Sequence, residues 1–439
     1  MKFFCIPLFT CKAGIVDSLD FSQLRLEEVP KEILKSRKFV EELLLNVNGI
    51  ESLPPVSVLF ENPNFQELVT APTHPIQEFF RCTKLKKLDL SENKLKVLPG
   101  EVGALQSLMD LNLSKNEIVE LPEEIGDCRS LQSLNISTNI VPGLPKSITN
   151  LSELTNLNVS NNSLTQLPHD IEQLVCLQYL DAGQCELRFL PLSITQLRQL
   201  RVLDVCENYL TELPNGLDGL ESLEVFDLHN NMINTIPDDI LKCQSLRTLD
   251  LSSNSLTHLP DNIGDLRQLS ELNVSDNSIS QLPSSIGQLR KLEILKASKN
   301  RLTELTPAIC SCEQLTDLIL CENLLCELPS SLGNLHRLKF LDVNVNNLRH
   351  VPTTIGGCQQ LGVLSMRHNH LQDLAMEVGR LDKLQVLDLA DNQLTYLPFT
   401  LTVLINQQTL SALWLSFNQP ALPKLSVTNE PIMNVCVCG

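Results

Sequence analysis

The chain has 439 residues, of which 43% are hydrophobic but only 4% aromatic, and its formal net charge at pH 7 is −18. So acidic a chain lacks the basic stripe that contacts nucleic-acid phosphates, and it is not attracted unaided to an anionic membrane. No stretch of about 18 apolar residues occurs, so the sequence predicts no transmembrane helix.

The first element is an N-terminal segment, residues 1–15, which begins MKFFCIPLF. Its apolar residues predict a cap over the exposed end of the repeat array that follows, because the terminal core of such an array must be covered. Pro7 interrupts the apolar run, which makes a secretory signal the weaker interpretation.

A repeat domain is expected over residues 16–423. Two loose repeats begin it, at residues 16–26 and 40–50. Residues 55–80 lack the repeat pattern and carry Pro63, Pro72 and Pro75. Because proline removes a hydrogen-bond donor and breaks regular strands, we expect a degenerate repeat or a bulging loop there.

After residue 80 the pattern becomes strict, with an asparagine, or in one repeat a cysteine, every 23 residues through fourteen consecutive repeats. Each closes a frame L-x-x-L-x-L-x-x-N-x-L, usually followed by L-P, which is the signature of leucine-rich repeats. The fourteen positions are Asn93, Asn116, Asn139, Asn162, Cys185, Asn208, Asn231, Asn254, Asn277, Asn300, Asn323, Asn346, Asn369 and Asn392.

The frame also predicts the structure of one repeat. Alternating leucines indicate a short strand, and the helical spacing of apolar residues after L-P indicates a short helix or 3₁₀ turn. We therefore expect an α/β fold, a curved leucine-rich repeat solenoid with a parallel sheet on its concave face and short helices or 3₁₀ turns on its convex face. Residues 424–439 are expected to form a C-terminal tail.

The recurrent asparagines should form an internal ladder, because an amide has both donors and an acceptor for backbone groups at a sharp turn. Losing one, as in Asn254→Ala, should cost about 1–3 kcal/mol by leaving buried backbone groups unpaired. Cys185, which takes one asparagine position, is expected to be a ladder defect and not a functional thiol.

The positions of the 15 cysteines argue against disulfides and metal ligands. Five share one repeat position, three residues before the first leucine, and we expect small buried side chains there on the convex side. These five are Cys82, Cys128, Cys243, Cys312 and Cys358.

The residues between the leucines point outward onto the concave face, and there we expect partner binding. Asp181, Asp204, Asp227 and Asp250 take the central strand position of four successive repeats. Their mutual repulsion, about 1–3 kcal/mol per pair, should be offset in part by Arg201 and Arg247 and in part by a basic partner. The sequence L-D-L-S is also common in leucine-rich repeats, so a purely structural role for these aspartates stays open.

In the second half of the array, the outward residues are mostly apolar or cationic instead of acidic. Aromatic and aliphatic side chains with cationic neighbours are typical of interface hot spots. The alternative is that β-branched residues are common here only because they have a high propensity for strands. The apolar candidates are Ile294, Ile319, Phe340, Val363, Val386 and Trp414, and the cationic ones are Lys296, Lys299, Arg301, Arg367 and His368. Trp414 could instead belong to the end cap.

Catalytic motifs are absent from the sequence. It contains no glycine-rich phosphate loop, no H-E-x-x-H and no G-x-S-x-G, so we expect no enzyme activity, no cofactor and no small-molecule substrate. His368 and His370 could share a metal only with a third ligand, which the sequence does not specify, and we expect no metal site.

Several stretches resemble the LAP family, the leucine-rich repeat and PDZ polarity scaffolds that include Scribble and Erbin. They are the N-terminal KFFCIPLFTC, then V-D-S-L-D-F-S, E-E-L-L-L-N-V-N-G-I, L-I-L-C-E-N-L-L and A-L-W-L-S-F-N-Q. The resemblance excludes residues 55–80 and about the last twenty, and the chain stops where a LAP protein continues into PDZ domains.

The resemblance implies a non-enzymatic scaffold that binds protein partners in epithelial cell polarity, and we expect the chain to be monomeric. It would be cytoplasmic and peripheral at the basolateral membrane and cell junctions. Family cysteines near the N-terminus are sites of S-acylation, and the matching residues here are Cys5 and Cys11. The alternative is a soluble leucine-rich repeat scaffold, or a regulatory subunit, of Ras or phosphatase signalling.

Overall fold

The computed structural model describes residues 11–12, 15–16, 18–30, 40–53, 80, 82–416 and 437–438. The degenerate segment 55–79, Cys5 and the tail up to residue 436 lie outside these residues, as does the side chain of Cys11. The chain divides into two compact units, residues 1–210 and 211–439, and each is described by itself.

Unit 1 contains one parallel sheet of short strands, preceded by an antiparallel pair, β1 (Cys11–Lys12) and β2 (Ile15–Val16). Consecutive strands pair in strict register, so that Leu134 of one strand lies opposite Leu157 of the next. The strands are β3 (Ser18–Asp20), β4 (Glu42–Leu44), β5 (Lys87–Asp89), β6 (Asp110–Asn112), β7 (Ser133–Asn135), β8 (Asn156–Asn158), β9 (Tyr179–Asp181) and β10 (Val202–Asp204).

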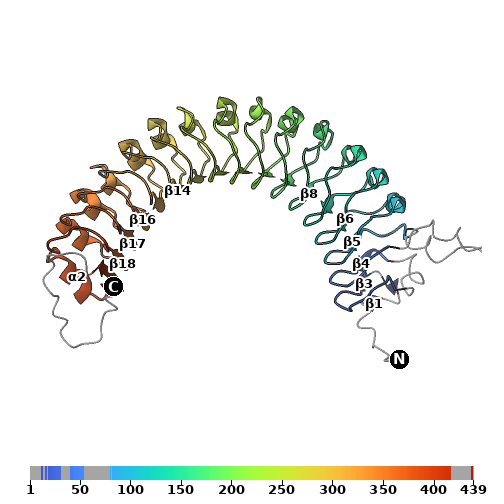
Figure 1. The fold of residues 1–439 in the computed structure, drawn as a ribbon, viewed down its shortest axis with the longest axis horizontal. Coiled ribbons are helices and arrows are strands. Elements are labelled where there is room, and N and C mark those ends of the chain that lie inside the picture. Colours follow the sequence, from blue (N-terminus) through green and yellow to red (C-terminus); the bar gives the residue numbers. More distant parts are fainter. Residues whose placement is uncertain are drawn as a thin grey trace, which may run out of the picture. The chain divides into compact units, whose positions relative to one another are not determined.

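Unit 2 repeats the same arrangement, and its last strand pairs with β20 (Val437–Cys438). Its strands are β11 (Val225–Asp227), β12 (Thr248–Asp250), β13 (Glu271–Asn273), β14 (Ile294–Lys296), β15 (Asp317–Ile319), β16 (Phe340–Asp342), β17 (Val363–Ser365), β18 (Val386–Asp388) and β19 (Ala412–Ser416). Within each unit the strands line the concave side (Figure 1).

Short 3₁₀ helices form the convex side of each unit (Figure 1). Proline precedes many of them, as at Pro99 and Pro283, where its missing N–H costs no hydrogen bond. Those of unit 1 are η4 (Gly100–Ala104), η5 (Glu123–Asp127), η6 (Lys146–Asn150), η7 (Ile171–Gln173) and η8 (Leu192–Gln196). Those of unit 2 are η9 (Leu217–Gly219), η10 (Asp238–Lys242), η11 (Ile263–Asp265), η12 (Ser284–Gln288), η13 (Pro307–Ser311), η14 (Leu332–Asn334), η15 (Thr353–Gly357) and η16 (Met376–Arg380).

One repeat departs from this form. After Asn392 the next strand arrives three residues late, and an α-helix, α2 (Leu401–Asn406), replaces the 3₁₀ turn. The longer spacing therefore supplies the residues of a helical turn.

The asparagine ladder is confirmed. Asn323 is 6% exposed, and its Oδ1 accepts the backbone N–H of Leu302 at 3.1 Å. Its Nδ2 donates to the carbonyl of Leu320 in its own repeat at 3.1 Å and to that of Ala297 in the preceding repeat at 2.9 Å. Each amide thus joins two repeats. Cys185 is buried, and its thiol contacts only one such carbonyl, that of Val159, at 3.5 Å.

The cysteines on the convex side also form hydrogen bonds between neighbouring repeats, which the sequence did not reveal. All five are buried, as expected. Four donate S–H to a carbonyl 26 residues earlier, at 3.2–3.4 Å: Cys128, Cys243, Cys312 and Cys358. Burial raises the pKa of Cys312 and Cys358 to about 12, so both thiols stay protonated.

Candidate functional site

The candidate site is built from the outward residues of the strands. In β12, Leu249 is buried while Thr248 and Asp250 are half-buried and face outward. Strict register aligns equivalent residues across a unit. We call the column of first strand residues, such as Thr248, the leading column, and that of third residues, such as Asp250, the central column.

The acidic residues of unit 1 are adjacent, with Asp181 in register with Asp204. Burial raises the pKa of Asp181, and the neighbouring charge of Asp204 adds to the effect. Asp181 accepts hydrogen bonds from the backbone of Gly183 at 3.1 Å and the amide of Asn158 at 3.0 Å. Neutral donors therefore support this carboxylate.

In unit 2, Asp227 lies in register with Asp250. The His229 ring approaches Asp227 at 2.8 Å, and the Asn273 amide donates to Asp250 at 2.9 Å. Arg247, expected to offset these aspartates, pairs instead with Glu224 at 3.5 Å.

The apolar candidates fall into two columns. Phe340, Val363, Val386 and Ala412 are consecutive in the leading column, and we call these four residues the apolar strip. Ile294 shares that column but is separated from the strip by Asp317. Ile319 and Trp414 lie in the central column, with Asp342, Ser365 and Asp388 between them. The apolar candidates therefore do not form one continuous column.

Three of the cationic candidates are already paired. Lys296 Nζ lies 2.8 Å from Glu271. Arg367 and His368 both contact Asp391, at 3.0 and 3.2 Å. Lys299 and Arg301 are exposed in the turn that follows β14, away from the strip. The expected cationic flank is thus largely neutralised within the protein.

The sequence interpretation missed Asp342 and Asp388, which lie beside the strip in the central column. They could have been found by aligning every strand at its central position, where L-D-V and L-D-L place an aspartate.

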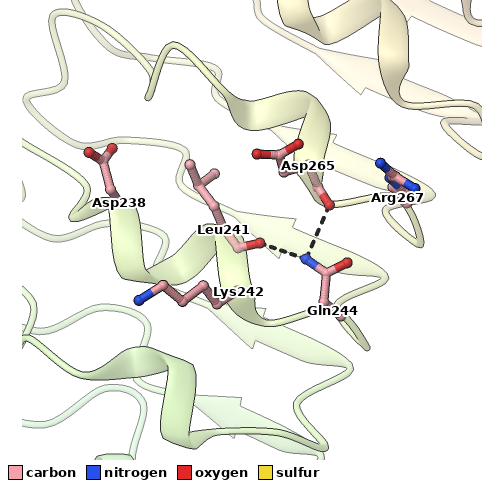
Figure 2. Close-up of a pocket in the computed structure, with 6 residues that line it drawn as sticks. All are labelled: Asp238, Leu241, Lys242, Gln244, Asp265 and Arg267. Atoms are coloured by element: carbon pink, nitrogen blue, oxygen red, sulfur yellow. Dashed lines mark hydrogen bonds between the residues drawn. The ribbon is translucent and has the colours of Figure 1, made fainter.

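Clefts on the convex side offer weaker candidates. One of about 370 Å³ lies between η10 and η11 and is lined by Asp238, Lys242, Asp265 and Arg267 (Figure 2). Gln244 bridges it by donating to the carbonyls of Leu241 and Asp265, at 2.7 and 3.2 Å (Figure 2).

Gln106 in unit 1 makes the same two bonds, to Gly103 and Asp127. The bridge is therefore a feature of the repeat, and we do not interpret the cleft as a ligand site.

Within the described residues, no group of three His, Cys, Asp or Glu side chains is placed to hold a metal ion. Among the same residues, no helix is long and apolar enough to cross a bilayer.

Comparison with known proteins agrees with the fold. A family described as "Leucine-rich repeat region" matches residues 65–163, 146–238 and 233–318, together more than half of the chain. A leucine-rich repeat protein of Leptospira interrogans has a solved structure with 32% identity and a TM-score of 0.73. The match covers 92% of this chain and 91% of that one.

A plant peptide hormone receptor, RGFR1 in complex with RGF2, is similar with a TM-score of 0.65 and 25% identity. The match covers 91% of this chain and 75% of that one. Leucine-rich repeat-containing protein 7 of Rattus norvegicus is 36% identical over 100 residues, which span 23% of this chain and 5% of that protein. The chain belongs to the leucine-rich repeat family.

Proposed function

We propose that this chain is a non-enzymatic scaffold that binds protein partners through its concave face. The observation that carries the proposal is the register of the strands, which aligns outward side chains into continuous columns. Such a surface suits an extended partner, because successive strands lie about 4.8 Å apart. The similar plant receptor was solved with RGF2 bound, which supports a protein or peptide ligand.

We further propose that the scaffold acts in epithelial cell polarity, at the basolateral membrane and cell junctions. This rests on the LAP-like sequences at the N-terminus and along the strands. Proximity labelling in epithelial cells tests it, and we expect junctional and basolateral proteins among the labelled partners. A partner list made up of soluble GTPase or phosphatase components would favour the alternative scaffold.

S-acylation of Cys5 and Cys11 is the proposed means of membrane attachment. With a net charge of −18 the chain needs another source of membrane affinity, and two acyl chains anchor where one binds reversibly. Acyl-biotin exchange on the full chain should label the wild type, and Cys5→Ser with Cys11→Ser should abolish the label and release the protein from membranes.

Cys326→Ser is the matched control, since Cys326 is an exposed cysteine within the array. It should leave both the label and the membrane fraction unchanged. Equal labelling of the wild type and the Cys5, Cys11 double variant would refute acylation at these residues.

A further inference from the structure

We propose that strands β16 to β19 bind an extended partner segment that is both apolar and basic, with one Lys or Arg head group seated over Ser365. The inference deepens the proposed function and rests on it, since it names the chemistry of the partner. It is carried by two neighbouring columns, one apolar and one acidic.

The apolar strip supplies the contact area. Its four residues belong to consecutive strands in register, so it extends about 14 Å at the spacing of parallel strands. That length matches about four residues of an extended chain. Gly362, which directly precedes β17, places no side chain beside the strip, and a Cβ there would be in ordinary contact with its nearest neighbours at 3.7 Å.

The acidic column lies directly beside the strip. Asp342 and Asp388 are two strands apart, with Ser365 in register between them. Their Oδ1 atoms accept the backbone N–H of Asn344 at 2.9 Å and of Ala390 at 3.0 Å, which fixes both carboxylates. Serine is the smallest residue in this part of the column, so it leaves room for a head group about 5 Å from each strand that carries a carboxylate.

The charges around the strip favour a cation over an anion. Within residues 82–416, no cationic side chain forms an ion pair with Asp342 or Asp388. Arg367 is held by Asp391, and Asp317 adds a further carboxylate at one end of the strip. Lys339 is exposed and directly precedes Phe340, at the edge of the strip. With Lys339 included, the net charge around the strip is still negative.

A cationic partner would stabilise the carboxylates of the central column, because Asp342 is partly buried. Burial raises the pKa of Asp342, and the charge of Asp388 raises it further, so the Asp342 carboxylate is poorly stabilised alone. A cation between them would relieve that repulsion, and the apolar strip would shield the ion pair from water. An acidic segment would instead add to the repulsion.

The test uses the full chain and three fluorescein-labelled nonapeptides, measured by fluorescence polarisation at physiological salt. The first alternates Leu with Arg, the second Leu with Glu, and the third Ser with Arg. The first should bind at least about tenfold tighter than either of the others, because only it satisfies both columns.

The variants Asp342→Asn and Asp388→Asn, combined, should weaken the Leu and Arg peptide by about tenfold. They should fold normally, because Asn273 takes the same column position and accepts the same backbone N–H, that of Ser275, at 3.2 Å. The matched control is Asp238→Asn with Asp265→Asn, which changes the net charge equally but lies on the convex side, where both residues are exposed on η10 and η11. It should leave the affinity unchanged.

Tighter binding of the Leu and Glu peptide, or an equal loss in both double variants, would overturn the basic partner while leaving concave-face binding intact. Absence of any peptide binding, together with an unchanged partner list for a variant that alters the concave face, would overturn the proposed function as well.

Discussion

The ladder makes a quantitative prediction for Asn323→Ala. In the wild type the Asn323 amide satisfies the buried N–H of Leu302 and donates to carbonyls of its own and the preceding repeat. Alanine keeps the backbone and removes all of these bonds.

The cost follows from which backbone groups are left unpaired. The carbonyl of Leu320 also accepts from Asn346 at 3.0 Å, and that of Ala297 also accepts from Asn300 at 3.3 Å. Only the N–H of Leu302 loses its sole protein acceptor among the described residues. One buried unpaired donor costs about 1–3 kcal/mol, so the free energy of unfolding should fall by about 2 kcal/mol.

Urea denaturation measures the total, and hydrogen–deuterium exchange measures the local effect. The Leu302 amide should exchange faster in the variant, while amides in distant repeats should not change, since each repeat contacts only its neighbours. Asn334→Ala, on an exposed asparagine of η14, is the matched control and should be nearly neutral. Equal stability and equal Leu302 exchange in the wild type and Asn323→Ala would refute the ladder reasoning.

Three further predictions concern the repeats. Cys185→Asn should raise the free energy of unfolding by about 1 kcal/mol by restoring an amide acceptor, and a lower urea midpoint would contradict this. Gly264→Ala should destabilise by about 2 kcal/mol or more in the same assay, because its Cβ would clash with the carbonyl oxygen of Ser285 in the next repeat. Gly362→Ala, whose nearest neighbours are 3.7 Å away, should be nearly neutral. Since burial raises the pKa of Cys312 and Cys358 from 9.0 to about 12, these thiols ionise first in the unfolded chain. The free energy of unfolding should therefore fall between pH 9 and 12, by about 1.4 kcal/mol per pH unit for each thiol, and replacing both by alanine should reduce that slope.

The parts of the fold that depend on local periodicity could be predicted from the sequence. The 23-residue spacing defines the buried leucines, the ladder amides and the convex 3₁₀ turns, because each is set within one repeat or between neighbours. The same reasoning placed the convex cysteines correctly. Their S–H bonds to the preceding repeat could not be predicted in this way, because they depend on how deeply each thiol lies in the core.

The candidate site was harder to predict, because it depends on which side chains share a column and which charges cancel. Ile319 and Phe340 look equivalent in the sequence, yet register places them in different columns. Arg367 looks like a free cation until its partner Asp391, 24 residues later, is brought within 3.0 Å. Sequence reasoning therefore identified the apolar side chains of these strands but not the pairing of their cationic neighbours with carboxylates.

The most direct test of the central claim is proximity labelling in epithelial cells with a variant of the concave face. The variant combines Phe340→Ala, Arg367→Ala and Asp227→Ala. A matched control makes the same three changes on the convex side, at Phe399, Arg380 and Asp382, which are exposed.

If the concave face binds the partners, the first variant loses most of the labelled proteins while the control keeps them. An unchanged partner list in the concave variant, or an equal loss in both variants, would contradict the account.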